Sequence, residues 1–362
     1  MPIIRNNRNS GVVLIVALWI LAVLTMLALG LANRIHVDIA MTKYAVGKMK
    51  ARYAAWAGVS YAMGRIKEDT DNEESSGWDD LYQNGFYLAE GEEPEDIFRD
   101  IAAGDGHFTI AYTIAEDGFA PRRYGFQDEE SRLNLNMMNP NNFDIFKYLI
   151  IEIGATGNQA EEIASAVVDW KDSDGDVFHK PFGAEEEYYW GGDGRYHCKN
   201  GAFENIEELM LVKGMSREIY EKLKPYVTVF PARGRFRINL QTVHEPVLRA
   251  AARHFAGQAN NTRPEDAASL ARKILAFRRG PDGLEATRDD RQVDRTEMNL
   301  TAKEDVIFRK LAQHQTRISR YLVVSVTGTD QASGISSFVT AGILRDDLSV
   351  FYWKRGREAT HD

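Results

Sequence analysis

The feature that most constrains this chain of 362 residues is an apolar stretch close to its N-terminus. Between Val12 and Leu31 only Thr25 and Gly30 interrupt the hydrocarbon side chains, and no charge lies between Arg8 and Arg34. About 20 such residues span a bilayer as a helix. A secretory signal has a shorter apolar region, of about 7 to 15 residues, and a small-x-small cleavage site. The stretch therefore predicts a transmembrane helix rather than a removable signal or a buried core helix.

Charge alone leaves the orientation of this helix open. Arg5 and Arg8 precede the stretch, whereas a larger group of basic residues follows it: Arg34, Lys43, Lys48, Lys50 and Arg52. Because cytoplasmic flanks usually carry the excess of Lys and Arg, a simple count places the larger, C-terminal part of the chain on the cytoplasmic side.

Composition excludes several classes of protein. With 44% hydrophobic and 27% charged residues, the chain beyond the apolar stretch is typical of globular proteins. The net charge of -9 argues against a general affinity for nucleic acid or for anionic lipid surfaces. Cys198 is the only cysteine, so neither an intrachain disulfide nor a cysteine zinc site is possible.

The helix is expected to continue beyond the membrane. No proline occurs before about Lys67, and a helix from Val12 to that point would be about 84 Å long. Large apolar residues recur at helical spacing and predict a stripe that packs partly on the protein's own sheet and partly on partner helices. These residues are Ile35, Ile39, Val46, Met49, Tyr53, Trp56 and Met63.

The remaining segments predict an α+β protein with a helical insertion. The acidic stretch 68–96 is aperiodic and is expected to be a surface excursion. Strand patterns cover 106–118, 122–136 and 320–356. Helical patterns cover 142–153, 160–170, 206–211, 216–226, 246–255, 267–279 and 303–311. Strands on both sides of about 180 helical residues favour one sheet over a separate all-β tail.

Carboxylates are concentrated in "DWKDSDGD" and "GAEEEYY". Asp172, Asp174 and Asp176 have the spacing of the opening of an EF-hand, but Val177 and Gly183 occupy its sixth and twelfth positions. Clustered carboxylates repel one another unless they are solvated or bind a hard cation such as calcium. The local pattern alone does not distinguish a solvated acidic loop from a calcium site. The candidate metal ligands are Asp172, Asp174, Asp176, Glu185 and Glu186, with Asp169 nearby.

Six features occur in a characteristic order. They are Gly11 before the apolar helix, then "DEESRLNLN" (128–136), "VVDWKDSDGD" (167–176), "GAEEEYY" (183–189), "ELMLVKGMSREIYEKLKPYVTVF" (208–230) and "INLQTVHEPVLRA" (238–250). In this order they resemble the minor pseudopilin K family of type II secretion (GspK). The resemblance extends over nearly the whole chain.

The resemblance has specific implications. A prepilin peptidase would cut after Gly11 on the cytoplasmic side, and Val12 would then be N-methylated. The chain would be a single-pass protein of the inner membrane of a Gram-negative bacterium, with its globular part in the periplasm. It would join I- and J-like minor pseudopilins at the tip of a pseudopilus, where it helps to initiate assembly for the export of folded proteins. It would bind calcium in the acidic region and bind no nucleic acid.

The fifth mature position departs from the usual pilin pattern. Most pilin-like proteins have a glutamate there, which can pair with the terminal amine of a neighbouring subunit in the membrane. This chain has Val16. Family K members typically lack the glutamate, consistent with a subunit at the tip; the alternative is that residue 16 simply faces lipid.

The resemblance also implies a division of the chain. Residues 1–11 would be the leader, 12–31 the transmembrane helix and 32–136 the first part of a pilin-like domain with an antiparallel sheet. Residues 137–233 and 234–316 would be two inserted α-helical modules of SAM-like or helix-hairpin-helix type, the first with the acidic loop. Residues 317–362 would return to the sheet.

Parts of the sequence suggest two other classes of function. The eight histidines lack HExxH spacing and no GxSxG or P-loop motif occurs, so the chain is not expected to be an enzyme. A membrane-anchored periplasmic metal-dependent enzyme is one alternative. A membrane-tethered helix-hairpin-helix DNA-uptake factor is the other, although the first hairpin has only Gly214 where DNA-binding hairpins usually have two glycines.

Overall fold

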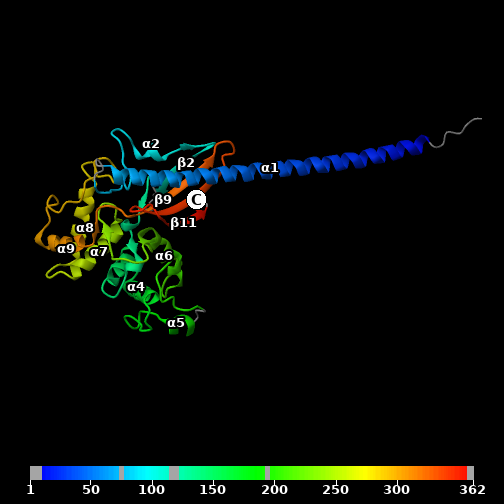
Figure 1. Cartoon of the computed structure of the whole chain (residues 1–362). Helices are drawn as coiled ribbons and strands as arrows, with labels where there is room; N and C mark the ends of the chain where they lie inside the picture. The colour runs from blue at the N-terminus through cyan, green and yellow to red at the C-terminus, as the bar shows by residue number, and fades with distance from the viewer. Residues whose placement is uncertain (1–9, 73–76, 114–121, 192–195, 357–362) are drawn as a thin grey trace, which may run out of the picture.

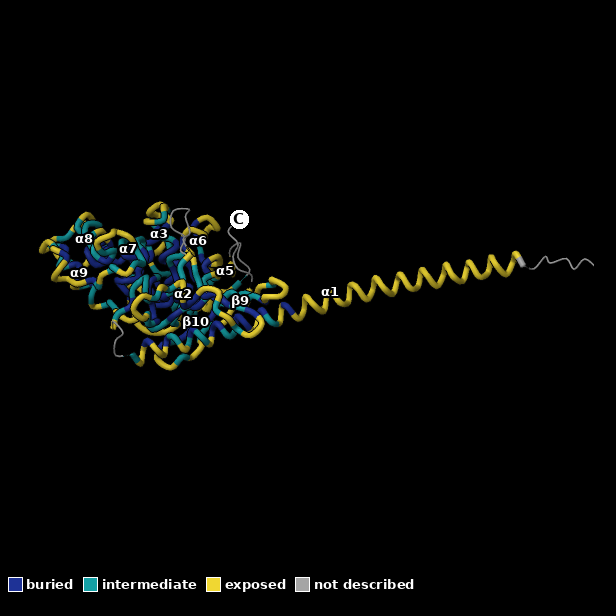
Figure 2. The backbone as a smooth tube through the Cα atoms, turned by 90° about the horizontal axis from the view of Figure 1, so that it is seen from above, coloured by how far each residue is buried: buried dark blue, intermediate teal, exposed yellow. Residues whose placement is uncertain are grey.

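The computed structural model describes residues 10–72, 77–113, 122–191 and 196–356. Its most prominent element is the helix α1, Ser10–Asp71, whose first part projects far from the rest of the protein (Figure 1). Every described side chain from Gly11 to Val46 is exposed (Figure 2). Among the described residues, α1 is the one helix long and apolar enough to cross a membrane. The prediction of one continuous helix is confirmed.

The second half of α1 covers an antiparallel seven-stranded sheet (Figure 1). The main strand order is β1-β2-β9-β10-β11, while β3 pairs with β2 and β4 pairs with β9. The strands are β1 Ile101–Ala103, β2 Gly106–Thr113, β3 Arg122–Tyr124, β4 Gln127–Asp128, β9 Tyr321–Asp330, β10 Ser336–Leu344 and β11 Val350–Gly356.

Strands from both ends of the globular part meet in the centre of this sheet. β2 pairs with β9 from Gly106 opposite Asp330 to Ile110 opposite Val326. The prediction of one sheet with a helical insertion is therefore confirmed, and the alternative of a separate all-β tail is wrong.

The face of α1 that contacts the sheet combines small residues with the buried Val59 and Ile66. Ala51, Ala55 and Ala62 are fully buried. A Cβ added to Gly58 would lie 2.4 Å from Val326 Cγ1, so helix and sheet approach very closely. Of the predicted stripe of large residues, Trp56 and Met63 pack against the core of the sheet domain, which agrees with the predicted sheet contact. The other members are exposed: Ile35, Ile39, Val46, Met49 and Tyr53.

The stretch 68–96 is not only a surface excursion, which corrects the sequence-based prediction. Phe86 is buried and packs edge-on against Phe98, at the end of α2 (Pro94–Phe98), and against Phe126. Asp79 is also buried and forms an ion pair with Arg345 at 2.7 Å. Asp69 is buried as well and pairs with the same arginine, so one aromatic and two carboxylates attach this acidic stretch to the sheet domain.

All seven predicted helical segments of the insertion are helical. They are α3 Phe143–Glu152, α4 Gly157–Lys171, the 3-10 helix η3 Ile206–Leu211, α6 Arg217–Leu223, α7 Glu245–Gly257, α8 Pro264–Arg278 and α9 Ala302–Ala312. A further short helix, α5, covers Glu186–Gly191.

Short parallel strand pairs bracket each half of the insertion. β5 Leu133–Asn134 pairs with β6 Val227–Thr228, and β7 Ile238–Asn239 pairs with β8 Gln315–Thr316. One hydrophobic core nevertheless runs through both halves, in which α3 packs against α7. The division at residues 233 and 234 stays a prediction.

Candidate functional site

Three carboxylates converge at the end of α4. Asp169 lies in its last turn, Asp172 is its C-cap, and Glu185 immediately precedes α5. Each offers an oxygen within 4.8 Å of the other two. Residues three apart on a helix lie on one side of it, which brings Asp169 and Asp172 together. The loop 173–184 then returns the chain so that Glu185 faces them.

The loop is folded around the Asp169 carboxylate. Its Oδ1 accepts a hydrogen bond from the backbone N–H of Phe178 at 2.9 Å, and its Oδ2 accepts one from Ala184 at 2.6 Å. Only glycine fits at position 183, because an added Cβ would lie 2.2 Å from Asp169 Oδ2. Lys213 secures the loop by donating to the carbonyls of residues 181, 182 and 183 at 3.0, 3.0 and 3.2 Å.

The Glu185 carboxylate is buried: the residue is 4% exposed, and among the described residues neither of its oxygens has a nitrogen or hydroxyl donor, as is also true of Asp172 Oδ1. The Cys198 thiol, a weak donor, faces the carboxylate but lowers its pKa less than burial raises it. Burial, reinforced by the neighbouring carboxylates, raises the pKa of Glu185 to about 7 and that of Asp169 to about 6. Burial also raises the pKa of Asp172. Buried carboxylate oxygens without such donors fit a hard divalent cation, which needs several oxygen ligands.

The structure separates the five predicted metal ligands. Asp172 and Glu185 lie in the convergent group, whereas Asp174 and Asp176 are exposed on the loop. Asp174 is close enough for its charge to raise the pKa of both Asp172 and Glu185. Glu186 points elsewhere: its Oε1 bonds His197 Nδ1, and its Oε2 accepts from the backbone N–H of Cys198 at 2.9 Å.

Asp169 was absent from the predicted ligands, although it belongs to the group. The signal that identifies it is its spacing of three from Asp172 on a helix that the sequence does predict. Because both of its oxygens already accept backbone hydrogen bonds, Asp169 has less capacity than Glu185 to bind a metal ion. Asp169 therefore both positions the loop and contributes charge to the group.

The predicted processing residues lie at the exposed start of α1. Gly11 has nothing within 4 Å of an added Cβ, and Val12 and Val16 are 61% and 51% exposed. Nothing within the described part of the chain covers the bond between residues 11 and 12.

The Gly214 turn, considered above for DNA binding, faces a carboxylate. Gly214 has a φ of +79°, as the turn requires, and an added Cβ would lie 2.9 Å from Glu162 Oε2. Glu162 also lies 3.5 Å from the Lys213 amine. A negative charge at this position opposes the approach of a phosphate group.

Comparison with solved structures defines the class of protein. The chain is similar to a chain in the crystal structure of the GspK-GspI-GspJ complex from enterotoxigenic Escherichia coli, with a TM-score of 0.61 and 17% identity. The match covers 89% of this chain and 99% of that chain. Together with the apolar α1 packed on an antiparallel sheet, it shows that the chain has the α+β fold of a pseudopilin.

Sequence comparisons narrow this class further. Residues 131–232 match the family described as "Type II secretion system (T2SS), protein K". Type II secretion system protein K of Aeromonas hydrophila is 25% identical over 246 residues, 67% of this chain and 69% of that protein. The Klebsiella pneumoniae protein is 25% identical over 66% of this chain and 68% of its own length. By these similarities and by its fold, the chain is a minor pseudopilin similar to type II secretion system protein K.

Proposed function

We propose that this minor pseudopilin is anchored in the inner membrane by the first part of α1, holds its globular part in the periplasm, and assembles with I- and J-like partners at the tip of the pseudopilus. The relative of known structure was crystallised in a GspK-GspI-GspJ complex, which supports this choice of partners. The role is structural rather than catalytic.

One observation carries the proposal. Between the apolar span and the sheet, α1 exposes large apolar side chains that nothing in the described chain covers. Ile39, Met41, Tyr44 and Met49 are 48%, 66%, 57% and 49% exposed. Such a surface outside the membrane is costly in water and is characteristic of a protein interface. Apolar helix faces of partner subunits would bury it.

Co-purification of the full mature chain with the other minor pseudopilins tests this interface. We expect Ile39→Glu with Met49→Glu to reduce recovery of the partners about tenfold or more, because two charges would be buried at the contact. Melting of the globular part should be unchanged, since both side chains are exposed. Ser60→Glu, an exposed position on the same helix, is the control. Undiminished recovery with the double variant would contradict the proposal.

We propose that the prepilin peptidase cuts between Gly11 and Val12 and that Val12 is then N-methylated. Gly11→Leu should prevent the cut, because a branched side chain obstructs access to the scissile backbone. Intact-mass measurement of membrane-extracted protein should show loss of residues 1–11 and gain of one methyl group in the wild type only. Gly30→Leu is a matched control, since that glycine also has open space around it. Full-length wild-type chains in cells with an active peptidase would refute the assignment.

Two features support a position at the tip. The insertion adds about 180 residues, more than a typical domain, and such a volume repeated along a shaft would cause collisions. Val16 lacks the carboxylate that could pair with the terminal amine of a subunit above it.

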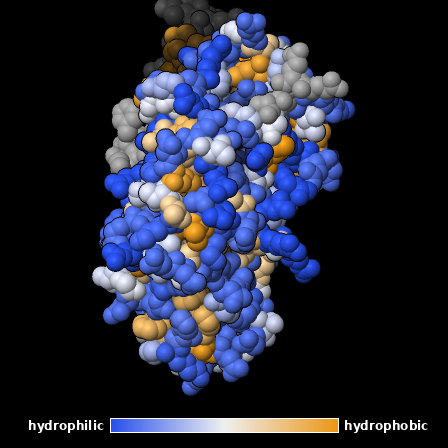
Figure 3. All heavy atoms as spheres, turned by 90° about the vertical axis from the view of Figure 1, so that its left-hand side faces the viewer, coloured by the Kyte–Doolittle hydropathy of each residue, from blue (hydrophilic) through white to orange (hydrophobic). Residues whose placement is uncertain are grey.

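The end of the globular part farthest from the start of α1 is mostly hydrophilic, with only small apolar patches on the face shown (Figure 3).

Labelling of the globular part on purified pseudopili tests the position. A single label at one end is the expected result. Regular labelling along the shafts would place the chain in the shaft and overturn the tip assignment, while leaving its membership of the pseudopilus intact.

We propose that calcium binds at the convergent carboxylates. Glu185 and Asp172 would hold the ion, with Asp169 supplying further charge; the exposed Asp174 and Asp176 lie on the loop beside it. The supporting observation is that the Glu185 oxygens have no nitrogen or hydroxyl donor among the described residues. Calcium would neutralise buried negative charge and so stabilise this half of the insertion.

A further inference from the structure

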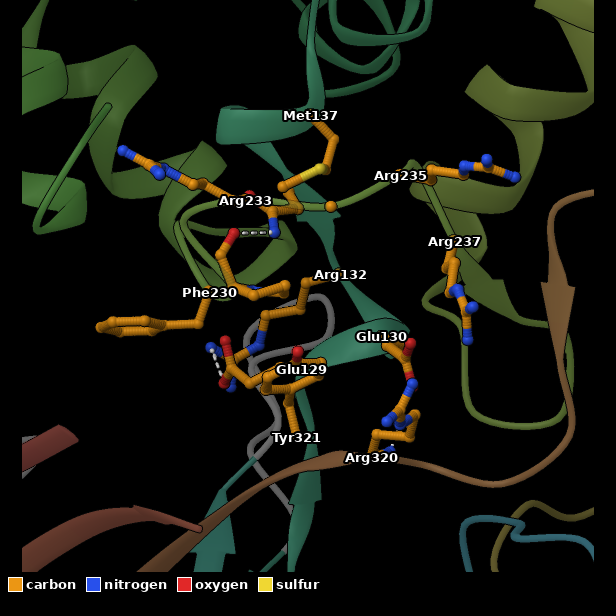
Figure 4. A pocket seen from close by; sticks show the side chains of 13 residues that line it. Glu129, Glu130, Arg132, Met137, Phe230, Arg233, Arg235, Arg237, Arg320 and Tyr321 are labelled. Carbon is orange, nitrogen blue, oxygen red and sulfur yellow. Dashed lines mark hydrogen bonds and ion pairs between the residues drawn. The ribbon is translucent and has the colours of Figure 1, made fainter. Parts of the chain in front are cut away.

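A cavity of about 250 Å³ lies where the insertion meets the sheet (Figure 4). Its walls come from three distant parts of the chain: residues 129–137, 230–237 and 320–321. A second cavity, of about 690 Å³, adjoins the first and shares Met137, Gly234, Arg235 and Arg237 with it. We call the two together the arginine groove.

Basic side chains dominate the groove. Arg132 and Arg320 are already engaged: Arg132 forms an ion pair with Glu129 at 3.3 Å, and Arg320 forms one with Asp346. The segment 231–237 then adds Arg233, Arg235 and Arg237, all exposed. Within the described residues, none of these three guanidinium groups forms a hydrogen bond or an ion pair, although the positive charge of Arg237 partly offsets the rise in the pKa of Glu130. In a chain of net charge -9, three neighbouring cations make the groove locally positive.

The carboxylates of the groove do not neutralise these three arginines. Glu129 is taken by Arg132 and by the hydroxyl of Thr228. Glu130 accepts from the backbone N–H of Arg320 at 3.2 Å, and burial, reinforced by Asp128, raises its pKa to about 7. Glu130 is therefore only partly ionised at neutral pH, and an outside anion would not meet a full opposing charge.

The arrangement of the arginines indicates the shape of the ligand. Figure 4 shows Arg233 and Arg235 extending to opposite sides, while Arg237 points towards Glu130 and Arg320. Charges spread along a groove suit an extended ligand with separated carboxylates better than one compact phosphate. The second cavity is lined by side-chain amides, including Asn141, Gln313 and Gln315, which can bond a peptide backbone.

We propose that the arginine groove binds an acidic, extended peptide segment of a partner protein. Arginine pairs with carboxylates through two parallel hydrogen bonds, and the neighbouring Phe230, Tyr321 and Met137 provide apolar contacts for intervening side chains. A nucleic acid fits less well, because outside the groove a chain of net charge -9 opposes a long, continuously charged polyanion. The inference does not depend on a position at the tip of the pseudopilus.

Fluorescence anisotropy tests the proposal with the full mature chain in non-ionic detergent. The probe is a short rhodamine-labelled peptide of alternating Asp and Gly, compared with its Asn-Gly counterpart. We expect the acidic peptide to bind about tenfold more tightly or better, and the affinity to fall with added NaCl. Arg233→Gln with Arg235→Gln and Arg237→Gln should abolish this preference.

A matched triple variant controls for net charge. Arg217→Gln with Lys224→Gln and Arg272→Gln removes three exposed cations of the insertion that do not line the groove, and it should leave binding unchanged. Equal binding of both peptides, or equal loss in both triple variants, would overturn the proposal. Binding of a single-stranded oligonucleotide or of inorganic phosphate in preference to the acidic peptide would overturn it as well.

Discussion

Gly328→Val should prevent α1 from docking on the sheet. Gly328 lies in β9 directly under the helix, and an added Cβ would lie 2.2 Å from Ala55 N and 2.4 Å from Ala51 O. Both contacts are backbone atoms, which cannot move aside as a flexible side chain would. Overpacking usually lowers the free energy of unfolding by about 1 to 3 kcal/mol. Because Gly328→Val would clash with helix backbone, we expect a loss of about 3 kcal/mol or more.

Thermal unfolding and limited proteolysis of the mature protein in detergent measure this effect. The variant should melt at a markedly lower temperature, and protease should cut α1 between residues 47 and 71, where it is protected in the wild type. Gly356→Val is the matched control, a glycine of β11 with nothing within 4 Å of an added Cβ. Equal melting temperatures of wild type and Gly328→Val would show that helix and sheet are not packed as described.

Glu185→Gln should stabilise the calcium-free protein and abolish its response to calcium. In the wild type the carboxylate is buried and has no nitrogen or hydroxyl donor among the described residues, so its ionised form destabilises the fold. A rise in pKa from 4.5 to about 7 corresponds to about 3 kcal/mol at most. The amide removes this charge at nearly the same volume. The same change removes a proposed calcium ligand. The substitution should therefore raise the melting temperature without calcium and remove the further rise that calcium causes in the wild type.

The pH dependence of stability follows from the raised pKa of Glu185. Because the folded protein holds the proton of Glu185 more tightly than the unfolded chain, the associated stability is full below about pH 4.5 and is lost as the pH rises through about 7. The calcium-free wild type should therefore melt at a lower temperature at pH 8 than at pH 5, and this difference should be smaller in Glu185→Gln.

Differential scanning fluorimetry with EDTA and with millimolar calcium measures both effects. Glu187→Gln, an exposed neighbour in α5, is the control and should behave as the wild type. If calcium leaves the melting temperature of the wild type unchanged, the carboxylates bind no calcium under these conditions. If calcium stabilises Glu185→Gln as much as the wild type, the ion binds at other residues.

Sequence periodicity located the elements well but did not reveal how closely α1 approaches the sheet. The helices of the insertion and the strands around it carry apolar residues at regular spacing, so they could be located. The close approach of α1 to the sheet depends on Ala51, Ala55 and Gly58, whose small size gives little hydrophobic signal. The predicted stripe contributes Trp56 and Met63 to the same contact.

The candidate sites differed in how far the sequence revealed them. Asp172 and Glu185 lie within one short stretch, so local composition was enough to indicate an acidic site. Which carboxylates converge depends on the path of the loop, which Asp169, Gly183 and Lys213 determine. The arginine groove could not be predicted, because only the tertiary fold brings together the distant segments that form its walls.

The parallel strand pairs at the base of the insertion have a consequence for the order in which the chain folds. Pairing β2 with β9 before the insertion folds would close a very long flexible loop. Once β5 has paired with β6, and β7 with β8, each helical half begins and ends at nearly the same place. The flexible length between β2 and β9 is then roughly sixfold shorter, which lowers the entropic cost of joining them by about 1.5 to 2 kcal/mol. We therefore expect the helices of the insertion to fold first and the sheet to assemble last. In this order α1 docks on the sheet only after β2 has paired with β9.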